Sequence, residues 1–168
     1  MGMIALIGRS LGDVVELLPI CPKGGECKFY RGSNDNLLDE ANRSLAAMPR
    51  EVRARDGELI LLHNKQSGTL RARAEHLVTW DRYGEVNRHK MSTLHLVPTT
   101  LEHCAVRVDD DRDGRKLYIA KYSADSLHCV VIEPKTIRHP PDGFAGYLIT
   151  QFPYDPRGRQ RFLRVEWA

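Results

Sequence analysis

Apolar residues in the second half of the chain are concentrated in three short runs, separated by residues typical of turns. The runs cover residues 116–122, 127–133 and 146–152 and are rich in β-branched and aromatic side chains. Residues 123–126 suit a hairpin loop, and prolines and a glycine lie in the loop before the third run. This pattern predicts an antiparallel meander, with a last alternating strand over residues 162–167.

Side-chain alternation predicts how the first two strands of the meander pair. If Tyr122 lies opposite Leu127, then Lys121 lies opposite His128, and both basic side chains share one largely apolar face. In one interpretation they lie at the rim, with the lysine ammonium in water. In the other they form a cationic pair at the mouth of a cleft, where the lysine would lower the histidine pKa.

Apolar residues at helical spacing indicate a helix over residues 34–48, with Asn34 or Asp35 as its cap. A shorter helix is expected over residues 10–18. Residues 58–63 and 69–80 are expected to form strands, although the alanine, arginine and glutamate content of the second stretch also suits a helix.

These elements predict an α+β fold in which N-terminal helices precede a curved antiparallel sheet. A chain of 168 residues suits one domain. Within it we expect a helical and loop part over residues 1–56 and a sheet-bearing part over residues 57–168. The polar stretch 50–57 is the one internal boundary that the sequence offers.

Composition favours a soluble globular protein, because 42% of the residues are hydrophobic and 28% are charged. No apolar run approaches the roughly 20 residues of a membrane span. The N-terminal residues lack a secretory pattern, so we expect a cytoplasmic protein without membrane contact. The net charge of +3 permits nucleic-acid binding without establishing it. The basic residues expected to contact nucleic acid are Arg88, Arg112, Arg115, Lys116, Arg157 and Arg159.

The four cysteines are expected to be free thiols, given the absence of a secretory pattern. Cys21 and Cys27 flank a turn that could present two thiolates to zinc, with Cys104 and Cys129 beside histidines as further ligands. The five-residue gap between the first two is longer than the usual two to four. We therefore expect no metal and no other cofactor.

Residues 80–100 contain the densest group of reactive side chains. His89, Lys90, Ser92 and His95 lie within seven residues. If residues 86–96 are helical, Ser92 and His95 share a face with Arg88, and Pro98 ends the segment.

The order of short motifs across residues 89–153 resembles phage-borne members of the barnase–EndoU–colicin–RelE-like ribonuclease group. The motifs are Thr100-Leu101, Val106-Arg107, residues 114–118, residues 130–132 and residues 148–153. The resemblance implies helices followed by a curved sheet of about four strands, and RNA cleavage without a metal by attack of the ribose 2′-hydroxyl on phosphate. RNA, including tRNA, and a cognate inhibitor are then the implied partners.

Members of this group use a histidine in the helix before the sheet, basic residues on the strands and a Ser or Thr on a late strand. The resemblance therefore implies His89 or His95 in the helix role, Lys121 and His128 in the strand roles, and Thr150 in the late-strand role.

Two other functions are open on sequence grounds. A phage or mobile-element binding, structural or inhibitor protein would use the arginine-flanked sheet to hold protein or RNA. Tyr30-Arg31-Gly32 is similar to a motif of ADP-ribosyltransferases, whose arginine holds the NAD phosphates. The other motifs of those enzymes, a Ser-Thr-Ser-like strand and a Glu-x-Glu loop, are absent from the sequence.

Overall fold

The computed structural model describes residues 15–63, 70–79, 85–109, 114–135, 143–154 and 164–165. Its helices are η1 (Val15–Leu17), α2 (Asn34–Ala47), α3 (Leu70–Val78), α4 (Arg88–Thr93), η3 (Leu94–Leu96) and α5 (Val97–His103). Its strands are β1 (Glu51–Arg53), β2 (Leu59–Leu61), β3 (Val106–Asp109), β4 (Lys116–Ser123), β5 (Ser126–Pro134), β6 (Gly146–Tyr154) and β7 (Arg164–Val165). None of the described helices is long and apolar enough to cross a membrane.

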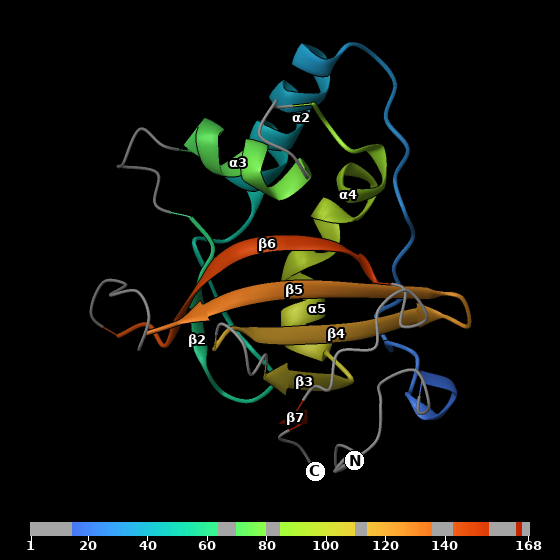
Figure 1. Ribbon diagram of the computed structural model, residues 1–168, viewed down its shortest axis with the longest axis vertical. Helices are drawn as coiled ribbons and strands as arrows, with labels where there is room; N and C mark the ends of the chain where they lie inside the picture. The colour runs from blue at the N-terminus through green and yellow to red at the C-terminus, as the bar shows by residue number, and fades with distance from the viewer. Residues whose placement is uncertain are drawn as a thin grey trace.

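The strands form one curled sheet in the order β1-β2-β6-β5-β4-β3-β7 (Figure 1). The α+β class, with helices ahead of a curved sheet, is therefore confirmed. The sheet is not purely antiparallel as predicted, because β2 and β6 pair in parallel. Parallel neighbours need a long crossover, and the chain between these two strands contains helices α3 to α5 and strands β3 to β5.

The meander itself is confirmed, since β4, β5 and β6 cover the three predicted runs and extend them by one or two residues. Most of the predicted last strand lies outside the described residues, but residues 164–165 form β7 antiparallel to β3. Of the helix predicted over residues 10–18, residues 10–14 also lie outside the described part, and Val15–Leu17 is a 3₁₀ turn.

The predicted register between β4 and β5 is wrong by one residue. Lys121 pairs with Leu127, Ala120 pairs with His128, and Ser123 pairs with Ser126 across a two-residue turn. Tyr122 is the extra residue of a bulge between Lys121 and Ser123, which shifts the pairing.

This one-residue shift places Lys121 and His128 on opposite faces of the sheet. By alternation, His128 shares a face with Val130, which belongs to the apolar cluster that the helices cover. Lys121 shares the other face with Ile119, which packs with Cys129 in a second apolar cluster. The cationic pair expected from the sequence does not form across this hairpin.

Residues 69–80 do not form the expected strand, because Leu70–Val78 is the helix α3. Ala74, Leu77 and Val78 are its buried residues, at a helical spacing, so the helix propensity of this stretch prevails. The expected boundary at residues 50–57 is occupied by β1 and the turn that returns to β2. A strand therefore falls within the part expected to be helix and loop.

Pro98 begins a helix instead of ending one. It occupies the first turn of α5, where its missing N–H removes no hydrogen bond and its fixed φ suits the helix. The predicted 86–96 helix is divided into α4 and the 3₁₀ turn η3. The helix expected over residues 34–48 is confirmed as α2, with Ser33 as the cap in place of Asn34 or Asp35.

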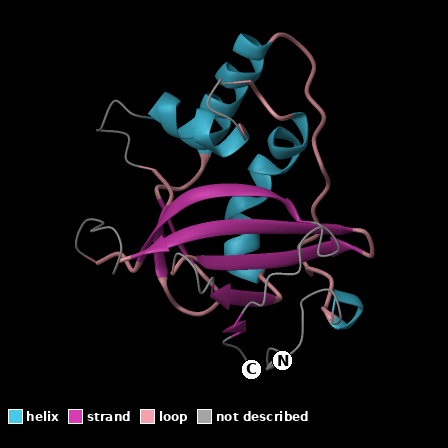
Figure 2. Cartoon of the chain, in the orientation of Figure 1, coloured by secondary structure: helices cyan, strands magenta, loops and turns pink. Residues whose placement is uncertain are grey.

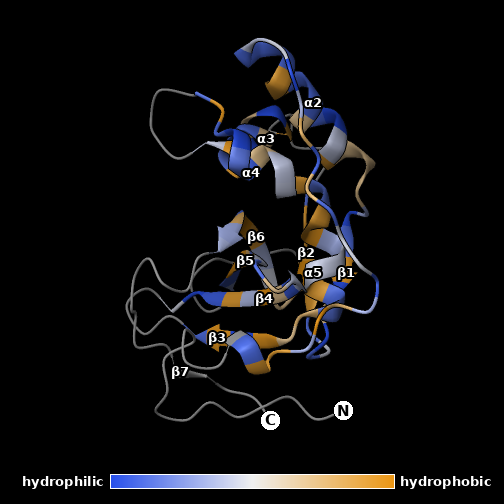
Figure 3. Cartoon of the chain, turned by 90° about the vertical axis from the view of Figure 1, so that its right-hand side faces the viewer, coloured by the Kyte–Doolittle hydropathy of each residue, from blue (hydrophilic) through white to orange (hydrophobic). Residues whose placement is uncertain are grey.

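The helices occupy two positions around the sheet (Figures 1 and 2). Helix α5 packs on β4 and β5, whereas α2, α3 and α4 gather beyond β6, a separation that is also visible from the side (Figure 3). Among the described residues, only Gly146 and Tyr147 of β6 pair with β2. The rest of this edge of β6 faces α3 and α4, and Arg73 on α3 donates to the carbonyl of Leu148 there.

Candidate functional site

Helix α4 carries three consecutive basic residues, Arg88, His89 and Lys90. It packs on β6, of which only Gly146 and Tyr147 pair with β2 among the described residues. Asn87 caps the helix, and its side-chain oxygen accepts a hydrogen bond from the Lys90 N–H at 3.0 Å. Arg88 and His89 are exposed, whereas Lys90 is buried. The helix thus presents one imidazole to solvent and directs one ammonium towards the sheet.

Lys90 lies where α3, α4 and β6 meet. Its Nζ donates to Thr79 O at 2.8 Å, to Thr150 Oγ1 at 2.9 Å and to His76 O at 3.5 Å. The side chain is only 2% exposed, and burial lowers the pKa of Lys90 to about 8. Thr150 is half-buried, so its hydroxyl is the part of this contact nearest to solvent.

Gln151, the residue after Thr150, is fully buried and links α3, α4 and β5. Its side-chain N–H groups donate to Leu77 O at 2.7 Å and to Lys90 O at 2.8 Å. Its oxygen lies 2.8 Å from Thr93 Oγ1 and 2.8 Å from His128 Nε2. Because this amide oxygen can only accept, His128 must carry its proton on Nε2.

The same chain of hydrogen bonds continues to the β4–β5 hairpin. With Nε2 protonated, His128 Nδ1 accepts from the Thr100 hydroxyl at 2.7 Å, and Thr100 then accepts from the Tyr122 hydroxyl at 2.8 Å. His128 is 1% exposed, and burial lowers its pKa to about 4 despite the bond to Gln151. His128 is therefore a neutral, fully bonded residue of the interior.

The other residues given catalytic roles lie apart from one another. Lys121 is buried on the opposite face of the sheet from His128. His95 is half-buried on η3, where its Nε2 lies 2.8 Å from Glu26 O, and burial lowers its pKa. The structure instead brings the helix that carries His89 to the strand that carries Thr150.

Of the six basic residues expected to contact nucleic acid, the three that the structure describes lie on α4 and at the start of β4. Arg88 donates from α4 to the carbonyls of Tyr30 and Gly32, and Arg115 and Lys116 are half-buried at the start of β4. The remaining three, Arg112, Arg157 and Arg159, lie outside the described residues.

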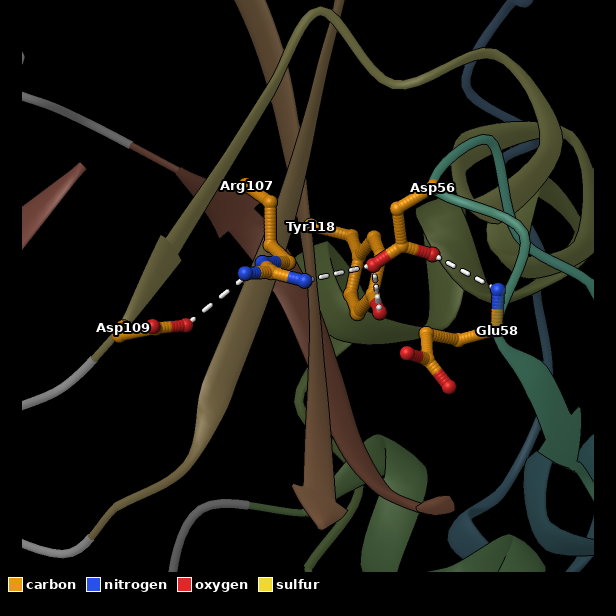
Figure 4. Close-up of polar contacts among 5 residues, drawn as sticks. All are labelled: Asp56, Glu58, Arg107, Asp109 and Tyr118. Atoms are coloured by element: carbon orange, nitrogen blue, oxygen red, sulfur yellow. Dashed lines mark hydrogen bonds and ion pairs between the residues drawn. The ribbon is translucent and has the colours of Figure 1, made fainter. Parts of the chain in front are cut away.

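A second polar cluster joins the β1–β2 turn to β3 and β4 (Figure 4). One oxygen of Asp56 accepts from Arg107 at 2.8 Å and from the Tyr118 hydroxyl at 2.9 Å, and the other accepts from the Glu58 N–H at 3.1 Å. Arg107 also pairs with Asp109 at 3.6 Å. Burial raises the pKa of the Tyr118 phenol, so it donates as a neutral group. We interpret this cluster as the fastening of the turn to the sheet.

The cysteines are free thiols, with Cys21 buried and Cys27 exposed. Within the described ranges, no three His, Cys, Asp or Glu side chains come together as a metal site requires. The alternative zinc site with Cys104 and Cys129 is therefore not assembled there.

Sequence reasoning missed three participants in this arrangement: Lys90 as the buried partner of Thr150, Gln151 as the central amide, and His76. The carbonyl of His76 lies 3.4 Å from Thr150 Oγ1, and its side chain is exposed. Their separation along the chain hides these contacts. The one feature of the sequence that could have drawn attention to Lys90 is its position directly after His89.

Comparisons of the chain with protein-family models, with curated proteins and with solved structures gave no match.

Burial of Lys90 predicts a specific pH dependence of stability. The folded protein releases this proton with a pKa of about 8, whereas an unfolded lysine does so near pH ~10.4. Between these values the unfolded chain binds more protons, so the contribution of Lys90 to the free energy of unfolding rises with pH. We expect the free energy of unfolding of wild type minus that of Lys90→Met to rise by on the order of 2 kcal/mol between these two pH values.

Urea unfolding of the two proteins at a series of pH values measures this difference. Burial raises the pKa values of the Cys104 thiol and the Tyr118 phenol, which lowers the stability of both proteins at alkaline pH. This effect cancels in the difference between them. A difference that stays flat with pH would contradict the assignment.

Proposed function

We propose that this protein is a metal-independent ribonuclease whose reaction takes place at the junction of α3, α4 and β6. The observation that carries the proposal is the 2.9 Å contact between Lys90 Nζ on α4 and Thr150 Oγ1 on β6. It joins the histidine-bearing helix to the threonine of the late strand, which is the combination implied by the resemblance across residues 89–153.

The reaction needs a base for the ribose 2′-hydroxyl, an acid for the leaving 5′-oxygen and donors for the charged phosphorane. His89 is exposed on α4, and histidine is the side chain most often used as a general acid or base. We assign it one of the two proton transfers. His76, whose backbone carbonyl contacts Thr150 and whose side chain is exposed, is the candidate for the other.

Thr150 and Lys90 have a different role in this proposal. The Thr150 hydroxyl, which donates to His76 O at 3.4 Å in the absence of RNA, turns its hydrogen to the phosphate, and Lys90, which is too buried to touch RNA, holds the hydroxyl oxygen and supplies positive charge behind it. His128 and Lys121 have no catalytic role in this scheme. The side chain of His128 bonds to Gln151, the residue after Thr150, and so helps to hold this part of β6 in position.

Incubation of labelled total RNA and tRNA with the protein in EDTA tests the proposal. Wild type is expected to give discrete fragments, and Thr150→Val to reduce the rate by at least about tenfold, since one donor to the phosphate is lost. Thr99→Val is the matched control, because Thr99 is half-buried on α5 away from the junction. Intact RNA with wild type would contradict the proposal and favour the non-catalytic binding protein.

A further inference from the structure

In the part of the chain that the structure describes, the most exposed large apolar side chains lie within residues 17–29. Among the described residues, the large hydrophobic side chains with high exposure are Leu17 at 61%, Ile20 at 55% and Phe29 at 85%. Phe29 therefore contributes little to the packed core. An exposed phenyl ring offers a flat apolar face on which a ligand can stack.

The backbone around Phe29 is fixed to α4 and η3 at several points. The Lys28 N–H donates to Ser92 O at 3.0 Å, and the Arg88 guanidinium donates to Tyr30 O at 3.0 Å and to Gly32 O at 3.2 Å. These bonds secure the residues on both sides of Phe29. The aromatic ring is thus presented by an ordered segment, which lowers the entropy cost of binding a ligand.

Basic residues flank Phe29 along the chain. Lys28 and Arg31 are exposed on either side of it, and Arg88 adds a third cation through its contacts with the same segment. Glu26 and Asp35 are the nearby acids in sequence, and Glu40, whose charge adds to burial in raising the pKa of the Tyr30 phenol, is paired with Arg43 at 2.6 Å. An exposed aromatic ring among cations suits a ligand that offers both a flat π-face and phosphates.

We propose that Phe29 is a stacking platform for an unpaired base of RNA, with Lys28 and Arg31 contacting the adjacent phosphates. The choice of RNA rests on the proposed function. Single-stranded RNA is required because the bases of a duplex are already stacked on each other. Arg88, which secures the platform, directly precedes His89 on α4. The platform therefore holds a nucleotide beside the helix that carries the reactive histidine.

Binding of a labelled single-stranded 2′-O-methyl RNA, measured by fluorescence anisotropy, tests the platform apart from cleavage. This probe has no 2′-hydroxyl and is inert in the proposed reaction. We expect Phe29→Ala to weaken binding by about fivefold or more and Phe29→Trp to preserve it, as stacking predicts. Ile20→Ala removes another exposed apolar side chain and is the matched control, expected to leave binding unchanged.

The outcomes separate the two proposals. Phe29-dependent binding without any cleavage of natural RNA would support the platform and overturn the nuclease. Cleavage together with equal binding by wild type and Phe29→Ala would overturn the platform alone. Equal weakening by Phe29→Ala and Ile20→Ala, or binding of duplex as tight as of single strands, would also overturn it, because either result indicates a different kind of surface.

Discussion

The His89→Ala protein is expected to cleave RNA in EDTA at least about 100-fold more slowly than wild type, the usual loss when a group that transfers a proton is removed. His89 is exposed on α4, one residue before the lysine that contacts Thr150. Because the imidazole lies at the surface, its removal should leave the urea midpoint of unfolding unchanged. Initial rates on one labelled RNA, with unfolding curves of the same preparations, measure both quantities.

The matched control for this prediction is His103→Ala. His103 is a half-buried histidine of α5, and its ring lies 3.8 Å from a carboxylate oxygen of Glu102. It is outside the α3–α4–β6 junction, so its variant should cleave RNA at the wild-type rate. If both histidine variants retain full activity, the assignment of His89 is wrong. If both variants lose activity equally, the loss is not specific to the α3–α4–β6 junction, and the assignment of His89 is again wrong.

The Gln151→Leu protein is expected to lose about 3 kcal/mol or more of unfolding free energy, because several buried polar groups lose their partner at once. The amide of Gln151 bonds with Leu77 O, Lys90 O, Thr93 Oγ1 and His128 Nε2, and none of its side chain is exposed. Leucine is similar in size, so the loss reflects hydrogen bonds more than a cavity. Urea unfolding at neutral pH measures the change.

A double-mutant cycle makes this prediction specific to the pair of Gln151 and His128. Removing both partners should cost less than the sum of Gln151→Leu and His128→Leu, since neither is then left with an unpaired buried group. Exposed Asn36→Ala serves as a surface control and should change stability little. A loss below about 1 kcal/mol in Gln151→Leu would show that the buried amide network does not hold β6 to the helices.

The meander could be predicted because its signals are local. β-Branched and aromatic runs divided by turn residues define β4, β5 and β6 almost to the residue. Their register could not be predicted, because Tyr122 forms a bulge and the turn shortens to two residues. Since neighbouring side chains on a strand point to opposite faces, that single residue separates Lys121 from His128.

The site was only partly accessible from the sequence for a related reason. The order of motifs predicts His89 or His95 in the helix role and Thr150 in the late-strand role, and these roles stay predictions. The contact between Lys90 and Thr150 depends on how α4 packs on β6, across a separation of 60 residues. The helix α3, which contains His76, could not be predicted with certainty from the sequence. Its composition suits a helix, whereas the alternation of its apolar and charged residues suggests a strand.

The exposure of Phe29 could likewise not be predicted from the sequence. The neighbouring Tyr30 packs against the core, whereas Phe29 is exposed. Two adjacent aromatic residues give the same signal in a sequence. The bonds of this segment to α4, from the Lys28 N–H to Ser92 O and from Arg88 to the carbonyls of Tyr30 and Gly32, help to fix which of the two faces solvent.

The chemical nature of the RNA ends produced in EDTA tests the central claim most directly. When the ribose 2′-hydroxyl attacks the phosphate, the phosphorus stays on the 3′ end of the upstream fragment as a cyclic phosphate, and the downstream fragment begins with a 5′-hydroxyl. Mass spectrometry of the wild-type products should find these ends, and His89→Ala should yield few of them. Fragments with 3′-hydroxyl and 5′-phosphate ends, or RNA that stays intact, would contradict the account.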